Sequence, residues 1–353
     1  MTTAIFGAGF SRAISNSMPT TVELGRELRR ADSDPTELAR IPEIQTGADL
    51  ERWLSRIAEA QPFLDDIDNA LGKVDFISAT RVIRGVLSDK QDQAMKQKLP
   101  EWLRTLVRYL HTTGSSVITF NYDTLLEQAT CSVLTEDLSS QYGAPVQPEF
   151  RGDRMPLLAI PPRRGHAQVS YVQEPSFSLV KLHGSIDAWW VPGDETGATI
   201  GTFRPQAWGS ERRPEQWDPD LQPAGREPFI IPPVSSKSPF YRNPITRHLW
   251  RDAAHALAAE RVSIVGYSVP MTDLTTASML EHALGRLDTA NSANQIDVVD
   301  INASLVKESL TALGVDESKI HLFEGVSDWV EDLIDTDLNG QPPAISPYGE
   351  AMD

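Results

Sequence analysis

Short apolar runs alternate along this chain with stretches whose apolar residues are spaced as in helices. β-branched residues dominate "TTAIF" at residues 2–6, "SSVITF" at 115–120 and "RVSIVGY" at 261–267, which predicts buried strands. The segments that follow space their apolar residues three and four apart, which predicts amphipathic helices. The short apolar run "EPFIIPP" at residues 227–233 is predicted as a further strand of this series. Strands separated by helices imply a parallel sheet with helices on both faces. We therefore predict an α/β fold with a doubly wound, Rossmann-like parallel sheet.

One long stretch interrupts this alternation. Residues 21–111 have helical periodicity and no clear strand; in "PEWLRTLVRYLHTT", for example, Leu103, Leu106 and Leu110 share one face. We expect a discontinuous Rossmann-like domain of residues 1–20 and 112–335, with a helical insertion at 21–111. Residues 139–176 and 188–228 are rich in Pro, Gly and Arg and are predicted as long loops.

The chain end and the overall charge narrow the possible partners. No Lys or Arg follows Lys319, so residues 336–353 are predicted as an acidic, flexible tail. The formal net charge of −17 would repel a phosphate backbone, and direct nucleic-acid binding is not expected.

No apolar run approaches the roughly 18 residues of a membrane helix, and no signal-like segment opens the chain. We expect a cytoplasmic protein that does not bind membranes.

A single cysteine, Cys131, is present. One thiol cannot build a disulfide framework or a four-cysteine zinc site. We therefore expect no zinc and no other resident metal.

Small and polar residues gather where the predicted strands end, and in such a sheet ligands bind beyond the carboxyl ends of the strands. Five strands end in this way, at Gly7–Ser11, at Asn121 and Asp123, at His183 and Gly184, at Gly266 and Ser268, and at Asn302. "GAG" at residues 7–9 lies between a strand and a helix, where glycine lets backbone N–H groups approach a pyrophosphate. Arg12 stands where the third glycine of the dehydrogenase fingerprint belongs, which disfavours hydride transfer.

Together these segments resemble a known family. "GAGFS" followed by "MPT", then "TFNYD", "KLHGS", "GYSVP" and "DIN" are similar, in order, to motifs of the sirtuins. The residues of these motifs most resemble those of the bacterial branch of sirtuin-like NAD hydrolases of antiphage defence. The resemblance runs from Ile5 to about Asn302, and it is poor over the helical insertion and the long loops.

The resemblance implies roles for individual residues. It implies that the NAD pyrophosphate is held by Gly7, Ala8, Gly9 and Ser11, and that Thr20 belongs to the loop on the nicotinamide side. It further implies that Asn121 and Asp123 lie beside the nicotinamide ribose and that His183 is the catalytic histidine. Gly266 and Ser268 would contact the phosphates and the adenosine ribose, and Asn302 the adenosine ribose. Lys237, in "IIPPVSSKSPFY", belongs to a segment recurrent in this branch and is expected to line the crevice.

The chain departs from protein-deacylating sirtuins in ways that bear on activity. The four zinc cysteines are missing, and Phe120 replaces the glutamine that usually precedes the asparagine. The resemblance therefore implies an NAD glycohydrolase that releases nicotinamide and ADP-ribose, with NAD as its substrate. It also implies control through a homo-oligomer or a separately encoded partner, such as an ATPase or an Argonaute-like protein.

The residue types suit this chemistry. Nicotinamide is a cationic leaving group, and its departure leaves an oxocarbenium-like centre on the ribose. An uncharged amide such as Asn121 can orient water and ribose hydroxyls, and Asp123 can support it at the helix start. An imidazole with a pKa near 6.5, such as that of His183, suits removal of a proton from water or a hydroxyl.

Several alternatives stay open. The chain can instead be an NAD-dependent deacylase, or a non-catalytic module that binds NAD or ADP-ribose. For the residues alone, Asn or Asp before a helix is commonly an N-cap, and a histidine at a strand end can be a satisfied core residue. Trp189, Trp190, Trp208 and Trp217 lie in or beside the second long loop and can stack on a base, although a small satellite core is favoured.

Overall fold

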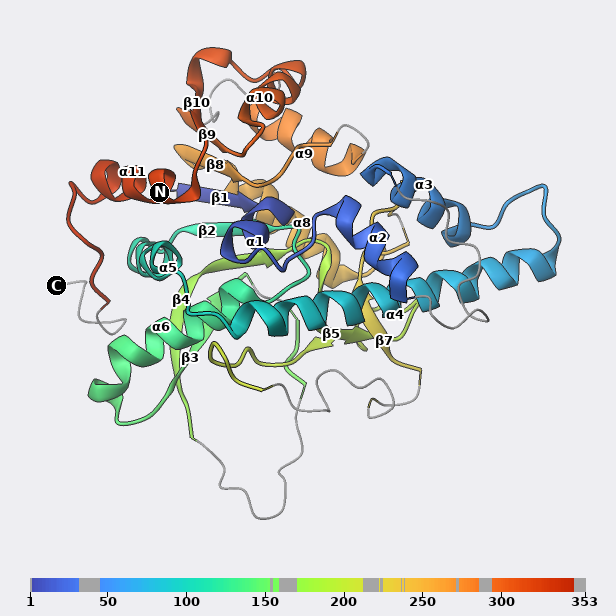
Figure 1. Ribbon diagram of the computed structural model, residues 1–353, viewed down its shortest axis with the longest axis horizontal. Helices are drawn as coiled ribbons and strands as arrows, with labels where there is room; N and C mark the ends of the chain where they lie inside the picture. Colours follow the sequence, from blue (N-terminus) through green and yellow to red (C-terminus); the bar gives the residue numbers. More distant parts are fainter. Residues whose placement is uncertain are drawn as a thin grey trace.

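A seven-stranded parallel sheet forms the centre of this computed structural model, with strands in the order β10-β9-β8-β1-β2-β4-β3. The structure describes residues 2–31, 45–152, 155–158, 170–211, 222, 225–235, 237, 239–270, 273–285 and 294–345. The strands are β1 Thr2–Phe6, β2 Ser116–Thr119, β3 Val146–Arg151, β4 Val172–Lys181, β8 Arg261–Val265, β9 Gln295–Val299 and β10 Ile320–Phe323. Figure 1 shows β1 in the middle, between β8 and β2. The predicted Rossmann-like α/β fold is confirmed.

Helices cover both faces of this sheet. The helices of the described residues are α1 Ala8–Ile14, α2 Thr21–Ala31, α3 Gly47–Ala58, α4 Asp66–Met95, α5 Glu101–Thr113, α6 Leu125–Tyr142, α8 Pro244–Ala256, α9 Leu274–Leu284, α10 Ala303–Ala312 and α11 Val326–Asp337, and not all of them lie on the sheet. Phe6 packs with residues of α5, α6 and α11, whereas its neighbour Ile5 packs with residues of α8, α9 and α10. Successive side chains of a strand point to opposite faces, so β1 is buried on both sides, which explains why Ala4, Ile5 and Phe6 are apolar in succession. None of the helices in the described ranges is long and apolar enough to cross a membrane.

A second, three-stranded antiparallel sheet follows β4. It consists of β5 Gly184–Trp190, β6 Gly201–Thr202 and β7 Glu227–Ile230, in the order β6-β5-β7. The segment "EPFIIPP", predicted as a strand of the series that forms the parallel sheet, instead pairs with β5 in this small sheet. Trp190 packs with Phe229 in a small separate core, as expected. Trp208 instead packs against the core of Phe6, and Trp217 lies outside the described residues.

The two predicted loops contain strands that the sequence did not reveal. β3 lies inside 139–176 and β6 inside 188–228. β3 reads "VQPEFR" and pairs with β4 only, across a register shift near Glu149. Pro148 has no backbone N–H to donate, so it is tolerated in an edge strand. In the sequence, a proline at this position is typical of a loop. The described parts of both predicted loops are therefore more ordered than expected.

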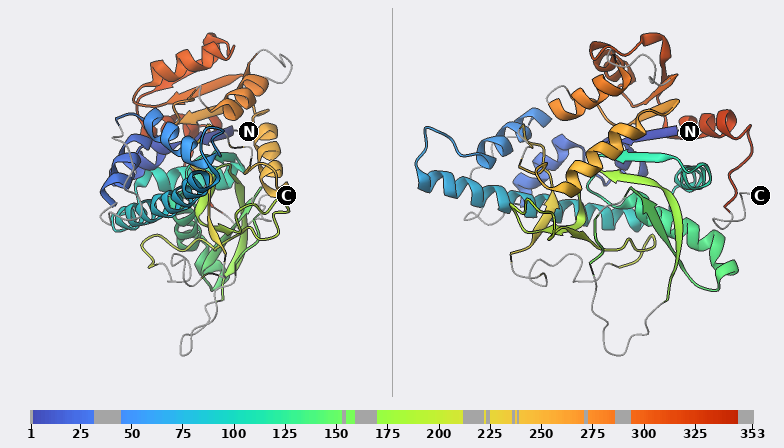
Figure 2. Two further views of the ribbon diagram at one scale, coloured as in Figure 1. Left: turned by 90° about the vertical axis from the view of Figure 1, so that its right-hand side faces the viewer. Right: turned by 180° about the vertical axis from the view of Figure 1, so that it is seen from behind.

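The predicted helical insertion divides into two parts. α2, α3 and α4 share a core that includes Leu28, Leu54 and Ile83, and this core also contacts Ile186 and Ile230 of the small sheet. α5, in contrast, packs on the parallel sheet in the core of Phe6. The helices outside the layers of the parallel sheet are thus α2 to α4, and Figure 2 shows α3 and the start of α4 extending away from the sheet.

The described part of the predicted tail, residues 336–345, lies against the main domain. Helix α11 extends to Asp337. After it, the side chains of Leu338 and Ile345 pack on buried core residues. The Thr112 hydroxyl donates a hydrogen bond to the Ala344 carbonyl at 3.3 Å. Residues 346–353 of the predicted tail fall outside the described residues.

A buried ion pair near the amino ends of the strands generates a stability prediction. The Asp297 carboxylate is fully buried and accepts hydrogen bonds from Arg261 Nε and from the Ser263 hydroxyl, both at 2.7 Å. Without Asp297, the buried Arg261 keeps only the more exposed carboxylates of Asp332 and Asp337, and the buried Ser263 hydroxyl loses its acceptor. We expect Asp297→Ala to lower the free energy of unfolding by about 3–5 kcal/mol in urea denaturation. Leu305→Ala, at a side chain 60% exposed, should change it by less than about 0.5 kcal/mol; equal effects would contradict this account.

Candidate functional site

The candidate site lies where the strand connections change direction. From β1 the chain proceeds to β2 and β4 on one side of the sheet, and it later returns to β8 on the other side of β1. Ligand crevices in such sheets form at this switch point, beyond the carboxyl ends of the strands. The turns after β1 and β8 meet here, since Gly7 N donates to the Val265 carbonyl at 3.1 Å and Gly9 N to the Gly266 carbonyl at 2.8 Å.

Close packing of these two turns explains the glycines. Gly266 has a φ of +60°, and a Cβ on it would lie 2.1 Å from the backbone nitrogen of Phe10. A Cβ on Gly9 would lie 2.6 Å from the Cα of Gly266. Only glycine adopts this backbone and this approach without strain. The "GAG" spacing is therefore required by contact between the turns, independently of any phosphate.

Asn121 ties the end of β2 to the first glycine turn. Its Nδ2 donates to the Gly7 carbonyl at 2.8 Å and to the Ser11 hydroxyl at 2.9 Å, and the Ser11 hydroxyl donates to Asp123 Oδ2 at 2.7 Å. Asp123 Oδ1 accepts from Leu125 N at 3.2 Å, at the first residue of α6. The structure thus joins Gly7, Ser11, Asn121 and Asp123 in one network, in which Asp123 supports the helix start.

A buried ion pair lies beneath this network. Lys181, the last residue of β4, donates to the Asp123 carbonyl at 2.6 Å and to Glu127 Oε1 at 2.8 Å, and both charged side chains are buried. Burial raises the pKa of Glu127, and the charge of Lys181 opposes this rise. Lys181 is part of the "KLHGS" motif, but its pairing with Glu127 was not predicted.

His183 follows β4 by two residues and enters an aromatic setting. Its ring lies 5.0 Å from that of Phe120 and 6.5 Å from that of Tyr122, measured between centroids. The side chain is 10% exposed, and Nε2 is 3.8 Å from Asp273 Oδ2. Gly184 permits the turn that follows, because its φ is +78° and a Cβ there would lie 2.0 Å from the Phe229 carbonyl oxygen.

A second ion pair sits beside this histidine. Lys237 Nζ donates to Asp273 Oδ2 at 2.6 Å, and both side chains are buried. Burial and then the positive charge of Lys237 lower the pKa of His183 below its ordinary value of 6.5, against the opposing effect of Asp273. The imidazole is therefore neutral at pH 7, the form that accepts a proton.

The sequence predicted that Lys237 lies near the crevice, but it did not predict a place for Asp273 in the site. In the sequence, Asp273 is only the polar residue before a helix, and it does accept Thr276 N at 3.4 Å as the N-cap of α9. Its second role depends on the loop that brings Lys237 to it, which no local pattern predicts.

The other predicted residues lie around this centre with other partners. Thr20 forms a reciprocal cap at the start of α2, since its N and hydroxyl donate to Glu23 Oε2 at 2.9 and 3.1 Å. Ala8 begins α1 and is half-buried; Ser268 and Asn302 are exposed, and Asn302 is the N-cap of α10.

Asn121 and His183 share a sheet edge but not their contacts. The Asn121 amide binds the turn of Gly7, while His183 packs with Phe120 and Asp273. A space of about 10 Å³ borders Ser11, Asn121 and Asp123, which is room for about one water molecule. A nicotinamide ring would enter only if the surrounding turns moved apart.

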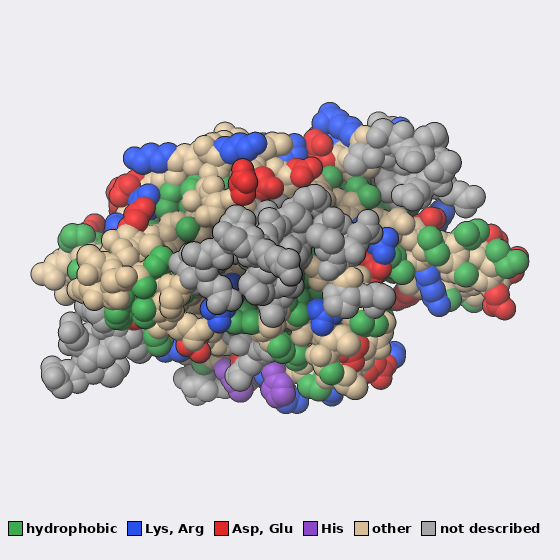
Figure 3. Space-filling model, turned by 90° about the horizontal axis from the view of Figure 1, so that it is seen from below, with side chains coloured by type: hydrophobic (Ala, Val, Ile, Leu, Met, Phe, Trp, Pro, Cys, Tyr) green, Lys and Arg blue, Asp and Glu red, His purple; other side chains and the backbone are tan. Residues whose placement is uncertain are grey.

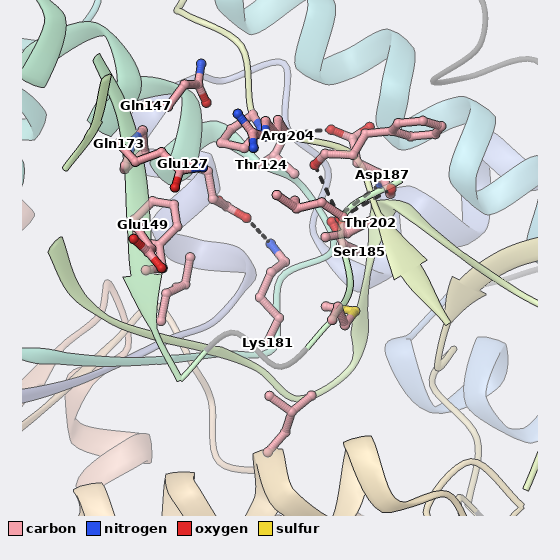
Figure 4. A pocket seen from close by; sticks show the side chains of 18 residues that line it. Thr124, Glu127, Gln147, Glu149, Gln173, Lys181, Ser185, Asp187, Thr202 and Arg204 are labelled. Atoms are coloured by element: carbon pink, nitrogen blue, oxygen red, sulfur yellow. Dashed lines mark hydrogen bonds and ion pairs between the residues drawn. The ribbon is translucent and has the colours of Figure 1, made fainter. Parts of the chain in front are cut away.

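A larger cavity of about 220 Å³ lies on the other side of Lys181, between β3, β4 and the small sheet. Figure 4 shows Lys181 directed at Glu127, with Ser185, Asp187 and Thr202 gathered on a neighbouring wall. Neither Asn121 nor His183 lines this cavity. It adjoins the predicted nucleotide site only through Lys181 and Glu127, which border both spaces.

Within the described ranges, no three His, Cys, Asp or Glu side chains are grouped so as to hold a metal ion. Comparison with protein-family models finds no match, and comparison with curated proteins finds none either.

The ion pair of Lys181 and Glu127 generates a pH prediction. The folded pKa of Glu127 lies above its unfolded value of about 4.5. Between these two pH values the folded state binds more protons than the unfolded state, so the free energy of unfolding falls as the pH rises. Lys181→Met should raise the folded pKa of Glu127 further. We expect this variant to lose stability as the pH rises above about 4.5 and toward the raised folded pKa of Glu127, by up to about 1.4 kcal/mol per pH unit in urea denaturation.

The control for this prediction is the double variant Lys181→Met/Glu127→Gln, which lacks the titrating group. It should show a flatter pH dependence than Lys181→Met alone. Identical slopes for the two variants would contradict the assignment of the effect to Glu127.

Proposed function

We propose that the chain is an NAD glycohydrolase that cleaves the bond between nicotinamide and ribose. The observation that carries the proposal is the meeting of Gly7, Ser11, Asn121 and Asp123 in one hydrogen-bonded network at the switch point, with His183 at the end of the neighbouring strand β4. These are residues of the sirtuin-like motifs, and they come from three strand ends that are distant in the sequence. A phosphate-bearing ligand fits this edge in folds of this class.

The first chemical requirement is to place the ribose. In the proposal the turn of Gly7, Ala8 and Gly9 lies against the pyrophosphate, although the N–H groups of Gly7 and Gly9 donate to the turn after β8. Gly266, Ser268 and Asn302 flank the adenosine half. Thr20 borders the nicotinamide side. The Asn121 amide, now bound to Gly7 and Ser11, exchanges one of these partners for a ribose hydroxyl or a water molecule when the turns open. Asp123 keeps the α6 start in place during this exchange.

The second requirement is proton transfer. The electron pair of the C1′–N bond leaves with nicotinamide, the oxygen of a water molecule bonds to C1′, and a proton of that water passes to Nε2 of His183. The products are nicotinamide, ADP-ribose and one proton. A neutral imidazole suits this role, and the Asp273 carboxylate 3.8 Å away stabilises the imidazolium that forms.

The motif resemblance extends the proposal to biology. The protein depletes cellular NAD as an effector of bacterial antiphage defence in the cytoplasm, and it is activated by self-assembly or by a separately encoded partner. A strain that carries the gene should lose NAD after infection by a phage it resists, and the His183→Ala strain should not.

Nicotinamide release tests the chemistry. We expect the purified chain, assayed over a concentration range that includes any oligomer, to release nicotinamide from NAD. His183→Ala should lower kcat by about 10²-fold or more because it removes the proton acceptor, and Asn121→Ala should lower it similarly. His321→Ala, at an exposed histidine on β10, is the matched control and should leave kcat unchanged.

Two outcomes would contradict this proposal. Wild-type rates in both His183→Ala and Asn121→Ala would remove these residues from the reaction. Tight NAD binding without turnover by the intact chain under every assembly condition would instead identify a non-catalytic binding module.

Lys237 generates a second prediction. Because its charge lowers the pKa of His183, Lys237→Met should raise that pKa and move the acid limb of the kcat/KM profile toward neutral pH. Lys237→Arg keeps the charge and should keep the limb near its wild-type position. An acid limb that stays unchanged in Lys237→Met would show that His183 is not the group that must be neutral.

A further inference from the structure

The amino-terminal half of α4 carries apolar side chains that nothing in the described structure covers. Farther along the helix, Ala79, Ile83 and Leu87 are buried in the core with α2 and α3. Near its start, Ile67, Leu71 and Val74 are 71%, 51% and 58% exposed. Phe63, just before the helix, is 76% exposed. Figure 1 shows that this part of α4 projects beyond the sheet, and Figure 3 shows hydrophobic side chains on that end of the molecule.

These residues form a regular stripe. Ile67, Ala70, Leu71 and Val74 are spaced at i, i+3, i+4 and i+7 and are all exposed, so they lie on one face of the helix. The opposite side of the same turns faces α3, since a Cβ on Gly72 would be 3.4 Å from the Ile57 carbonyl oxygen. The helix is therefore apolar on two faces, and only one of them is used within the described chain. This spacing is the one by which a helix accepts another helix.

Charged residues line both edges of the stripe. Asp68 and Asp75 are seven residues apart and follow one edge, and Asp66 and Lys73 are also seven apart and follow the other. The two edges of the apolar face therefore carry three carboxylates and one ammonium group. A second copy of the chain would bring the same acidic edges to the seam, and like charges facing each other oppose such pairing.

We propose that this stripe docks a basic amphipathic helix of a partner protein. The apolar side chains of the partner cover Ile67, Leu71 and Val74, and its Lys and Arg residues flank them and face Asp66, Asp68 and Asp75. This arrangement removes an exposed apolar patch of the kind that marks interaction sites on soluble proteins. It does not depend on the activity of the nucleotide site.

The test uses two synthetic helical peptides that share leucines at i, i+3, i+4 and i+7. One has lysines at the flanking positions and the other has glutamates. We expect fluorescence anisotropy with the full chain to show binding of the lysine peptide, at least tenfold tighter than the glutamate peptide and weakened by added salt. Ile67→Ser/Leu71→Ser should weaken it at least tenfold, and Asp68→Asn/Asp75→Asn should reduce the preference between the peptides.

Leu305→Ser is the matched control, because Leu305 is an exposed leucine on another helix, α10. It should leave peptide binding unchanged, and circular dichroism should show equal helix content in every variant. Failure of the lysine peptide to bind, or equal binding of both peptides, would overturn the proposal. So would self-association in analytical ultracentrifugation that Ile67→Ser/Leu71→Ser abolishes, since a second copy would then cover the stripe.

Discussion

Close contact between the turns after β1 and β8 is the constraint on which the rest of the site depends. Gly9 N donates to the Gly266 carbonyl at 2.8 Å, and neither residue tolerates a Cβ at this approach. This contact fixes the Gly7 carbonyl where Asn121 can bind it, at 2.8 Å, and thereby positions Ser11 and Asp123. The sheet edge is therefore closely packed at its centre. The chemistry proposed for it requires a controlled opening rather than a ready-made cleft.

Buried ion pairs hold the flanks of this edge. Lys181 links the end of β4 to Glu127 and to the backbone of Asp123, and Lys237 links the loop after β7 to Asp273 beside His183. Each pair joins segments that lie far apart in the sequence. Removing one member leaves a buried charge, so substitutions here change stability and proton affinity together. The position of Lys237 affects the pKa of His183, and the position of Lys181 affects the pKa of Glu127.

The parts of the fold that were predictable are those set by local periodicity. β1 buries all five residues of "TTAIF", of which the β-branched threonines and the apolar Ala4, Ile5 and Phe6 indicated a strand, and the helical spacing around Leu106 correctly predicted α5. β3 was missed because Pro148 and its alternating polar residues are typical of a loop, and β7 was assigned to the wrong sheet because a short apolar run does not encode its partner. Among the site residues, the sequence predicted the strand ends, but it did not predict that Asn121 binds Gly7 or that Asp273 meets His183.

In the proposed function, side chains from separate strand ends surround one nucleotide. Hydrogen–deuterium exchange of the full chain with and without NAD tests it directly, because backbone amides at the contacts become protected only where the ligand binds. The account predicts slower exchange together in residues 7–14, 120–125, 182–186 and 265–270. Protection confined to residues around the 220 Å³ cavity, or no change in exchange at saturating NAD, would contradict it.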